Sequence, residues 1–282
     1  MQHLVPLIKL IRLHNCLLAG AGVWIGGYLS NITGRDTEIY LASLAAALVC
    51  GAGNALNDYV DREADRTNHP VRPLPAGKLP AHTALLTAAL FNVLAIAAGG
   101  FVNISVLGVV LASIALLILY NVQLKGVPVI GNILVSILAG GTFMTGGLAA
   151  GGVVFALPGP IAPAIFAFLF HLGRELLKDV ADYEGDKEAG LRTLPLNTSL
   201  GAVMGLVTVI YITLILLTFV PIYLKWFSSV YGFMAVLAVD VPLVMVIGYL
   251  WFSKSAHRQK RACRALKLLM LFGLLAFVGG KS

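Results

Sequence analysis

Long apolar stretches, each close to the length that crosses a lipid bilayer, recur from one end of this chain to the other. A transmembrane helix needs about 20 mostly apolar residues. We expect nine such spans, at residues 14–30, 39–57, 81–101, 104–120, 127–148, 160–178, 200–224, 229–252 and 265–280. Only 12% of the residues are charged, about half the share found in soluble domains. We therefore predict an all-α polytopic membrane protein, a bundle of nine transmembrane helices.

The positions of lysine and arginine predict how this bundle is oriented. With the N-terminus in the cytoplasm, all of the 20 Lys and Arg residues except Arg35, Lys225 and Lys281 fall on the cytoplasmic side. Cytoplasmic loops of membrane proteins carry such an excess of positive charge. We therefore expect a multi-pass protein of the cytoplasmic membrane. We attribute the net charge of +7 to topology and not to nucleic-acid binding.

The acidic residues gather in two segments, both on the predicted cytoplasmic side. All of the 13 Asp and Glu residues except Asp36, Glu38 and Asp240 lie within 58–65 or 175–188. Both segments follow the end of a predicted span, so they can face each other across one mouth of the bundle. Asp240 alone lies in the middle of a span, where we expect a structural role.

The spacing inside the first acidic segment is helical. Asn57, Asp61 and Asp65 recur every four residues, and Asn54 and Asp58 form a neighbouring pair with the same spacing. Residues four apart on a helix lie on one face, a turn from each other. We therefore expect these side chains to project from one side of a helix.

The second acidic segment repeats this pattern. Glu175, Asp179, Asp182 and Asp186 again share one helical face. Like charges stacked in this way repel each other, and a divalent cation would offset the repulsion. Carboxylates without nearby Cys or paired His suit Mg²⁺, which usually binds one or two carboxylates together with substrate phosphates.

Cations near the two acidic segments suit the same chemistry. Arginine binds phosphate oxygens through a bidentate fork, and lysine binds them as a point charge. The stiff turn RPLPAGK, for example, could hold two cations over the site. The candidates are Arg66, Arg72, Lys78, Lys125, Arg174 and Lys178. The pattern predicts a magnesium-dependent diphosphate site at the cytoplasmic mouth.

The stretch NDYVDREAD, followed by RPLPAG and by KDVADYEGD in the second half, resembles the UbiA superfamily of intramembrane prenyltransferases. Members carry two Asp-rich motifs, NDxxDxxxD and DxxDxxxD, in two cytoplasmic helix–loop segments of a nine-helix bundle. The resemblance covers nearly the whole chain. It implies one domain over residues 1–282, with motif 1 at 54–78 and motif 2 at 173–195.

The resemblance also implies roles for individual residues. The metal ligands it implies are Asp58, Asp61, Asp65, Asp179, Asp182 and Asp186, with Asp61 and Asp182 also counted as catalytic. YNVQLK resembles the family's tyrosine-to-lysine stretch, which implies that Tyr120 and Lys125 are catalytic. RLHN resembles an Arg-x-x-Asn sequence that enters the first helix. We expect the substrates to be bound by Arg12, Asn15, Asn54, Asn57, Arg66, Arg72, Lys78, Arg174 and Lys178.

The activity that this resemblance implies is transfer of a prenyl group from its diphosphate to an acceptor in the membrane. Mg²⁺ and the cations would stabilise the leaving diphosphate, an apolar tunnel would exclude water, and the ring of Tyr120 would stabilise the cationic carbon. Motif 2 looks most like the branch that transfers geranylgeranyl to geranylgeranylglyceryl phosphate, an ether-lipid precursor. An aromatic acceptor such as 4-hydroxybenzoate stays open, because DRTNHPVRPLPAG is shared widely across the superfamily.

Two other classes of membrane protein fit parts of the pattern. An ion-coupled transporter also carries intramembrane acids, although its carboxylates are expected near the midplane. A lipid phosphotransferase also uses Mg²⁺ and aspartate, but usually in one Gly-containing motif that is absent here. The basic stretch 253–267 is expected to contact anionic lipid headgroups.

Overall fold

The computed structural model describes residues 4–124, 127–188, 190, 192–252 and 256–281, and every regular element within these ranges is helical. The predicted all-α class is confirmed. The helices are α1 (Leu4–Leu10), α2 (Leu13–Leu29), α3 (Asp36–Val60), α4 (Arg62–Asn68), α5 (Ala81–Val102), α6 (Ile104–Leu119), η1 (Tyr120–Leu124), α7 (Ile130–Ala150), α8 (Ile161–Ala181), α9 (Tyr183–Glu188), α10 (Leu194–Asn197), α11 (Leu200–Tyr223), α12 (Ser229–Ala235), η2 (Val236–Asp240), α13 (Val241–Trp251) and α14 (Ala256–Gly280). The two η elements are single π-helical turns.

Seven helices among the described residues are long and apolar enough to cross a membrane, and the bent pair α1 and α2 brings the number to eight. The chain is therefore an integral multi-pass membrane protein. The predicted count of nine spans is not confirmed. The span expected at 160–178 corresponds to α8, whose second half carries Arg174, Glu175, Lys178 and Asp179, and it is not among the seven.

The chain divides into two compact units. The first comprises Met1–Lys125 and Gly141–Phe155, and the second comprises Gly126–Gly140 and Ala156–Ser282. The single helix α7 belongs to the second unit over its first half and to the first unit over its second half.

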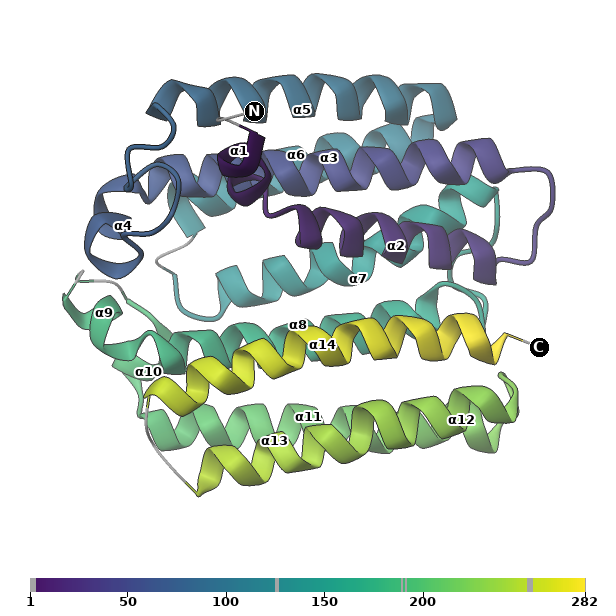
Figure 1. Ribbon diagram of the computed structural model, residues 1–282. Helices are drawn as coiled ribbons and strands as arrows, with labels where there is room; N and C mark the ends of the chain where they lie inside the picture. Colours follow the sequence, from purple (N-terminus) through teal and green to yellow (C-terminus); the bar gives the residue numbers. More distant parts are fainter. Residues whose placement is uncertain (1–3, 125–126, 189, 191, 253–255, 282) are drawn as a thin grey trace. The chain divides into compact units, whose positions relative to one another are not determined.

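The first unit is built around α3, which packs against α2, α5 and α6 (Figure 1). Glycine allows the closest approach, between α2 and α7. A Cβ atom on Gly26 would collide with the carbonyl oxygen of Phe143, and one on Gly146 with that of Val23. Small residues at membrane helix interfaces allow this kind of packing. The close approach on the α7 side lies in the Gly-rich run 137–152.

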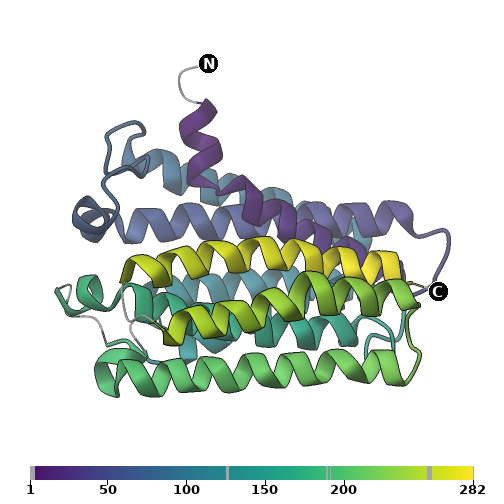
Figure 2. The ribbon, with the colours of Figure 1, turned by 60° about the horizontal axis from the view of Figure 1, so that its bottom comes forward.

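The second unit packs α8 against α11 and α14, and these helices run alongside each other in Figure 2. Its core is mostly aliphatic, with Leu177, Leu243 and Leu266 fully buried. Gly173 on α8 leaves room for the ring of Tyr211 on α11, because a Cβ atom at this position would meet that ring. The second half of α8, which carries motif 2, is thus held against a packed core.

Short helices follow the two long helices that carry the acidic motifs. The helix α4 continues from α3, and α9 continues from α8. The loop after α4 is held down because Leu79 is buried in a cluster with Leu10 of α1 and Ala84 of α5. This cluster fixes two chain segments, 4–12 and 69–80, beside the end of α3.

Candidate active site

Motif 1 crosses the junction between α3 and α4, and Asp61 is the junction residue. Its backbone N–H donates to the carbonyl of Asn57 at 2.9 Å, and the N–H of Asp65 donates to the carbonyl of Asp61 at 2.8 Å. One-turn hydrogen bonding therefore continues through the junction. The spacing that the sequence predicted on one helical face is kept locally, although two helices carry it.

Two carboxylates of motif 1 are buried and paired with arginines. Asp58 is 2% exposed and Asp65 is 4% exposed. Arg12 contacts Asp58 at 2.6 Å, and Arg72 contacts Asp65 at 2.5 Å and Asp58 at 3.6 Å. A buried carboxylate without a partner is strongly unfavourable, so these two guanidinium groups stabilise the acids in place.

Arg12 reaches Asp58 from a bend in the chain. The helices α1 and α2 meet at 55°, and Arg12 itself has left-handed backbone angles, φ 51° and ψ 61°. This conformation is unfavourable for residues other than glycine. It therefore persists only because the surroundings fix it, and it turns the Arg12 side chain toward motif 1.

Asn54 supports this bend. Its amide donates to the carbonyl of Ile11 at 2.9 Å, and the thiol of Cys16 donates to the same carbonyl at 3.2 Å. The carbonyl freed by the break in the helix is thus satisfied. Asn54, which was expected to bind substrate, holds the backbone beside Arg12.

Asn57 is held by a residue that the sequence analysis missed. Its amide donates to Oδ1 of Asn121 at 3.0 Å, and Asn121 donates to the carbonyl of Leu117 at 2.8 Å. Asn121 is buried in the π-helical turn η1, next to Tyr120. The signal for Asn121 in the sequence was its position among polar residues directly after an apolar span.

The side chains of the remaining candidates in the first unit are less buried than those of Asp58 and Asp65. Arg66 is exposed and pairs with Glu63 at 3.1 Å. Lys78 is exposed, and Asn15 is half-buried in the first turn of α2. Lys125 lies outside the described residues.

Motif 2 has the same backbone plan as motif 1. The helix α8 ends at Ala181, Asp182 forms the junction, and α9 follows. The N–H of Asp182 donates to the carbonyl of Lys178, and the N–H of Asp186 donates to that of Asp182, both at 2.9 Å. The acids of motif 2 therefore also recur by helical turns across a junction.

The polar partners in motif 2 are different. Asp179 accepts a hydrogen bond from the neutral amide of Asn132 on α7 at 2.8 Å. Arg174 and Lys178 contact Glu175, at 2.7 and 2.6 Å. Both cations were expected to bind substrate, and both pair with Glu175 instead. Glu175 is the one acid on this helical face that was not expected to bind the metal.

Asp182 pairs with a residue from the far end of the chain. Lys260 of α14 lies 3.5 Å from its Oδ1. Lys260 belongs to the basic stretch that was expected only to contact lipid headgroups, and its place beside motif 2 could not be read from its spacing. Asn132 was missed for the same reason.

The acids are all oxygen donors, which suits Mg²⁺. Within the described ranges, no three His, Cys, Asp or Glu side chains converge on a common point that could hold a metal. A magnesium site in a protein usually has one or two carboxylates and is completed by substrate phosphates and water. Asp179 and Asp182 fit such a partial set of ligands.

A bundle of membrane-spanning helices with two Asp-rich helix junctions is the arrangement expected of an intramembrane prenyltransferase. The sequence profile of the UbiA prenyltransferase family matches residues 16–274. The chain belongs to this family, and it is a prenyltransferase, as its sequence predicted. The transporter and phosphotransferase alternatives are thereby set aside.

Some relatives that match this chain over almost their whole length have names more specific than that of the family. The chain is 35% identical to digeranylgeranylglyceryl phosphate synthase of Methanopyrus kandleri over 273 residues, covering 96% of this chain and 97% of that protein. It is also 35% identical to the synthase of Methanococcus aeolicus over 280 residues, covering 97% and 96%.

Solved structures share the fold. A structure described as digeranylgeranylglyceryl phosphate synthase superposes with a TM-score of 0.74 at 30% identity, covering 99% of both chains. A UbiA homologue from Archaeoglobus fulgidus, bound to GPP and Mg²⁺, has a TM-score of 0.58 at 17% identity, covering 97% of this chain and 99% of that one.

Proposed function

We propose that this protein transfers a geranylgeranyl group from its diphosphate to the hydroxyl of geranylgeranylglyceryl phosphate, in a magnesium-dependent reaction. The observation that carries the acceptor is the 35% identity to digeranylgeranylglyceryl phosphate synthases over almost the whole chain. The paired motifs support a diphosphate donor, because both are rich in carboxylates and have cations beside them.

The reaction breaks the bond between C1 and oxygen in the donor, and its electron pair leaves with the diphosphate. The acceptor hydroxyl oxygen then forms a new bond to C1 and loses its proton. The product is an ether and inorganic diphosphate. When bound, Mg²⁺ neutralises charge that develops on the leaving diphosphate.

The main magnesium ligands that we propose are the aspartates of motif 2. Asp179 and Asp182 extend from one helix junction, with Asp186 a further turn along. The Asn132 amide orients the Asp179 carboxylate. Hydrogen bonds that orient a metal-binding carboxylate in this way tune metal affinity in many proteins.

Motif 1 is proposed to bind the diphosphate through its arginines, with Asp58, Asp61 and Asp65 also available to the metal. Arg12 and Arg72 contact carboxylates in the structure. The diphosphate of the donor would compete with these carboxylates for the arginines, and Mg²⁺ would compete with the arginines for the carboxylates. Arginine is well suited to this exchange, since its fork binds carboxylate and phosphate alike.

Tyr120 and Lys125 are proposed to act near the reacting carbon, where an aromatic ring stabilises a cation. The remaining candidates, Arg66, Lys78 and Asn15, are proposed to bind substrate from less buried positions. We also propose that residues 1–282 form one catalytic domain in the cytoplasmic membrane, with the N-terminus and the mouth of the site in the cytoplasm.

The test uses purified protein with Mg²⁺ and geranylgeranyl diphosphate, and offers geranylgeranylglyceryl phosphate and 4-hydroxybenzoate separately. We expect an ether product and diphosphate release, both lost in Asp61→Ala and Asp182→Ala. A prenylated aromatic product in place of the ether would contradict the proposed acceptor and keep the donor chemistry.

A further inference from the structure

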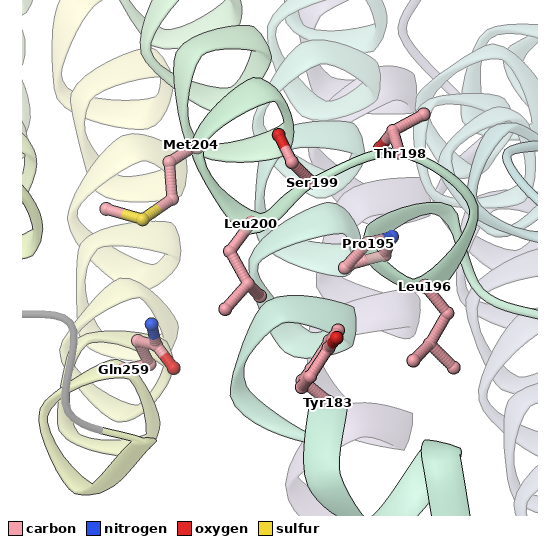
Figure 3. Close-up of a pocket in the computed structure, with 9 residues that line it drawn as sticks. Tyr183, Pro195, Leu196, Thr198, Ser199, Leu200, Met204 and Gln259 are labelled. Atoms are coloured by element: carbon pink, nitrogen blue, oxygen red, sulfur yellow. The ribbon is translucent and has the colours of Figure 1, made fainter.

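A pocket of about 400 Å³ lies within the second unit, where α9, α10 and the first turns of α11 and α14 meet. Its walls combine polar and apolar groups. Tyr183 and Gln259 contribute polar side chains, while Leu196, Leu200 and Met204 contribute apolar ones. Figure 3 shows Gln259 on α14 across from Leu200 and Tyr183. None of the roles proposed above uses this pocket.

The first turn of α11 presents backbone donors to the pocket. The N–H of Ala202 donates to Oγ of Ser199 at 3.1 Å, and the N–H of Val203 donates to the carbonyl of Ser199 at 3.2 Å. The N–H groups of Leu200 and Gly201 precede the helical ladder and are left for other acceptors. The N-terminus of a long helix attracts negative charge.

Gln259 is the second, independent sign of a ligand. Its side chain lines the pocket and is only 2% exposed. Its amide forms no hydrogen bond with any residue in the described part of the chain. The Gln259 side chain therefore faces the pocket with an amide that is available to an acceptor bound there.

The pocket adjoins motif 2 through two pairs of sequence neighbours. Tyr183 follows Asp182, and Gln259 precedes Lys260, and Asp182 and Lys260 contact each other at 3.5 Å. An anion bound between Tyr183 and Gln259 therefore lies beside a proposed metal ligand and a lysine. The apolar residues of the pocket suit a hydrocarbon chain joined to that anion.

We propose that this pocket binds the phosphate monoester of the lipid acceptor, through the Gln259 amide and the N–H groups of Leu200 and Gly201. This inference rests on the proposed function, because it places the acceptor phosphate of the same reaction. The apolar wall contacts the carbon chain next to the phosphate, and the pocket thereby selects phosphorylated glyceryl lipids over uncharged ones.

The test compares the wild type with Gln259→Leu, which removes the donor, and Gln259→Glu, which replaces it with a negative charge of similar size. Thr208→Val is the matched control, since it removes a polar group further along α11 that contacts Trp251 and lies outside the pocket. Steady-state kinetics give the Michaelis constant, KM, for each substrate.

We expect Gln259→Leu to raise KM for geranylgeranylglyceryl phosphate roughly tenfold to a hundredfold, the usual effect of losing a hydrogen bond to a charged group. Gln259→Glu raises it further. KM for the donor stays within about twofold in all variants, and Thr208→Val resembles the wild type. An unchanged acceptor KM in both Gln259 variants, with ether still formed, overturns the proposal.

Ligand-induced thermal stabilisation, without donor or metal, tests binding directly. We expect geranylgeranylglyceryl phosphate to raise the melting temperature of the wild type and Thr208→Val, and not that of Gln259→Glu. Equal protection by geranylgeranylglycerol, which lacks the phosphate, overturns the proposal. Equal protection by inorganic phosphate or by phosphatidylglycerol vesicles also overturns it, because the pocket then binds a general anion or a membrane headgroup.

The two proposals fail in different ways. If the wild type forms no ether from geranylgeranylglyceryl phosphate, the proposed function fails. If the ether forms and its acceptor KM does not depend on Gln259, only the pocket assignment fails.

Discussion

In motif 1 the buried carboxylates of Asp58 and Asp65 contact two guanidinium groups, whereas in motif 2 the carboxylate of Asp179 accepts a hydrogen bond from the neutral amide of Asn132. The backbone plan is the same in both, a long helix that passes through an aspartate junction into a short one. The local sequence sets the spacing of the acids, and residues from elsewhere in the chain set how much of their charge is neutralised. We infer that the carboxylate of Asp179 is more available to a metal ion than those of Asp58 and Asp65, which arginines already contact.

The largest effect is expected from Asp179→Asn, which keeps the size of the side chain and removes its charge. Loss of a metal ligand at motif 2 should lower kcat by at least about 100-fold and raise the Mg²⁺ concentration needed for half-maximal rate. Prenyl-transfer assays over a magnesium titration measure both. A larger shift in magnesium dependence for Asp58→Asn would reverse the comparison.

The next effect concerns stability in motif 1. Arg72→Met leaves Asp65 buried without its closest cation, and should lower the free energy of unfolding by roughly 2–3 kcal/mol, less than for a fully buried pair because Arg72 is partly exposed. Adding Asp65→Asn should restore part of this loss. Thermal unfolding in detergent measures the four members of the cycle. Additive losses would show that the pair does not stabilise the fold.

A smaller effect is expected from Asn132→Leu, which removes the donor to Asp179. The half-saturating Mg²⁺ concentration should rise about tenfold, as it does when other metal ligands lose the hydrogen bond that orients them. Asn121→Leu is the matched control, because Asn121 supports the amide of Asn57 and no carboxylate. Its magnesium dependence should match the wild type. Equal shifts in both variants would argue against a distinct role for Asn132.

The smallest effect is expected from Glu63→Gln. Glu63 lies in motif 1 but is 63% exposed, and its pairs with Arg62 and Arg66 are solvated. Exposed ion pairs contribute about 0.5 kcal/mol or less, so the melting temperature and kcat should both stay close to wild type. A loss of activity comparable to that expected in Asp61→Ala would show that exposed and buried acids of motif 1 are equally important.

The helical class and the two acid faces were predictable because they depend on local periodicity. Apolar runs define spans, and acids four residues apart define faces. The number of spans was less predictable, since α8 combines an apolar half with the charged half that carries motif 2. Composition alone does not decide whether such a helix crosses a bilayer.

The partners of the acids were less predictable, because they come from distant positions. Arg12 and Arg72 were among the candidates through resemblance and through clustering, but nothing in the spacing assigned them to Asp58 and Asp65. Asn132 and Lys260 were not candidates at all. Their contacts with motif 2 depend on tertiary packing within the second unit, which residue periodicity does not encode.

The left-handed backbone at Arg12 has a consequence for mutational tolerance. Position 12 must adopt a conformation that favours glycine or asparagine, and must also supply a cation to Asp58. Lysine meets the second requirement and, like arginine, adopts the left-handed conformation only at a cost, while glycine meets the first requirement and not the second. In a library that replaces every position with all amino acids, we expect this site to accept fewer substitutions than its partly exposed side chain would suggest.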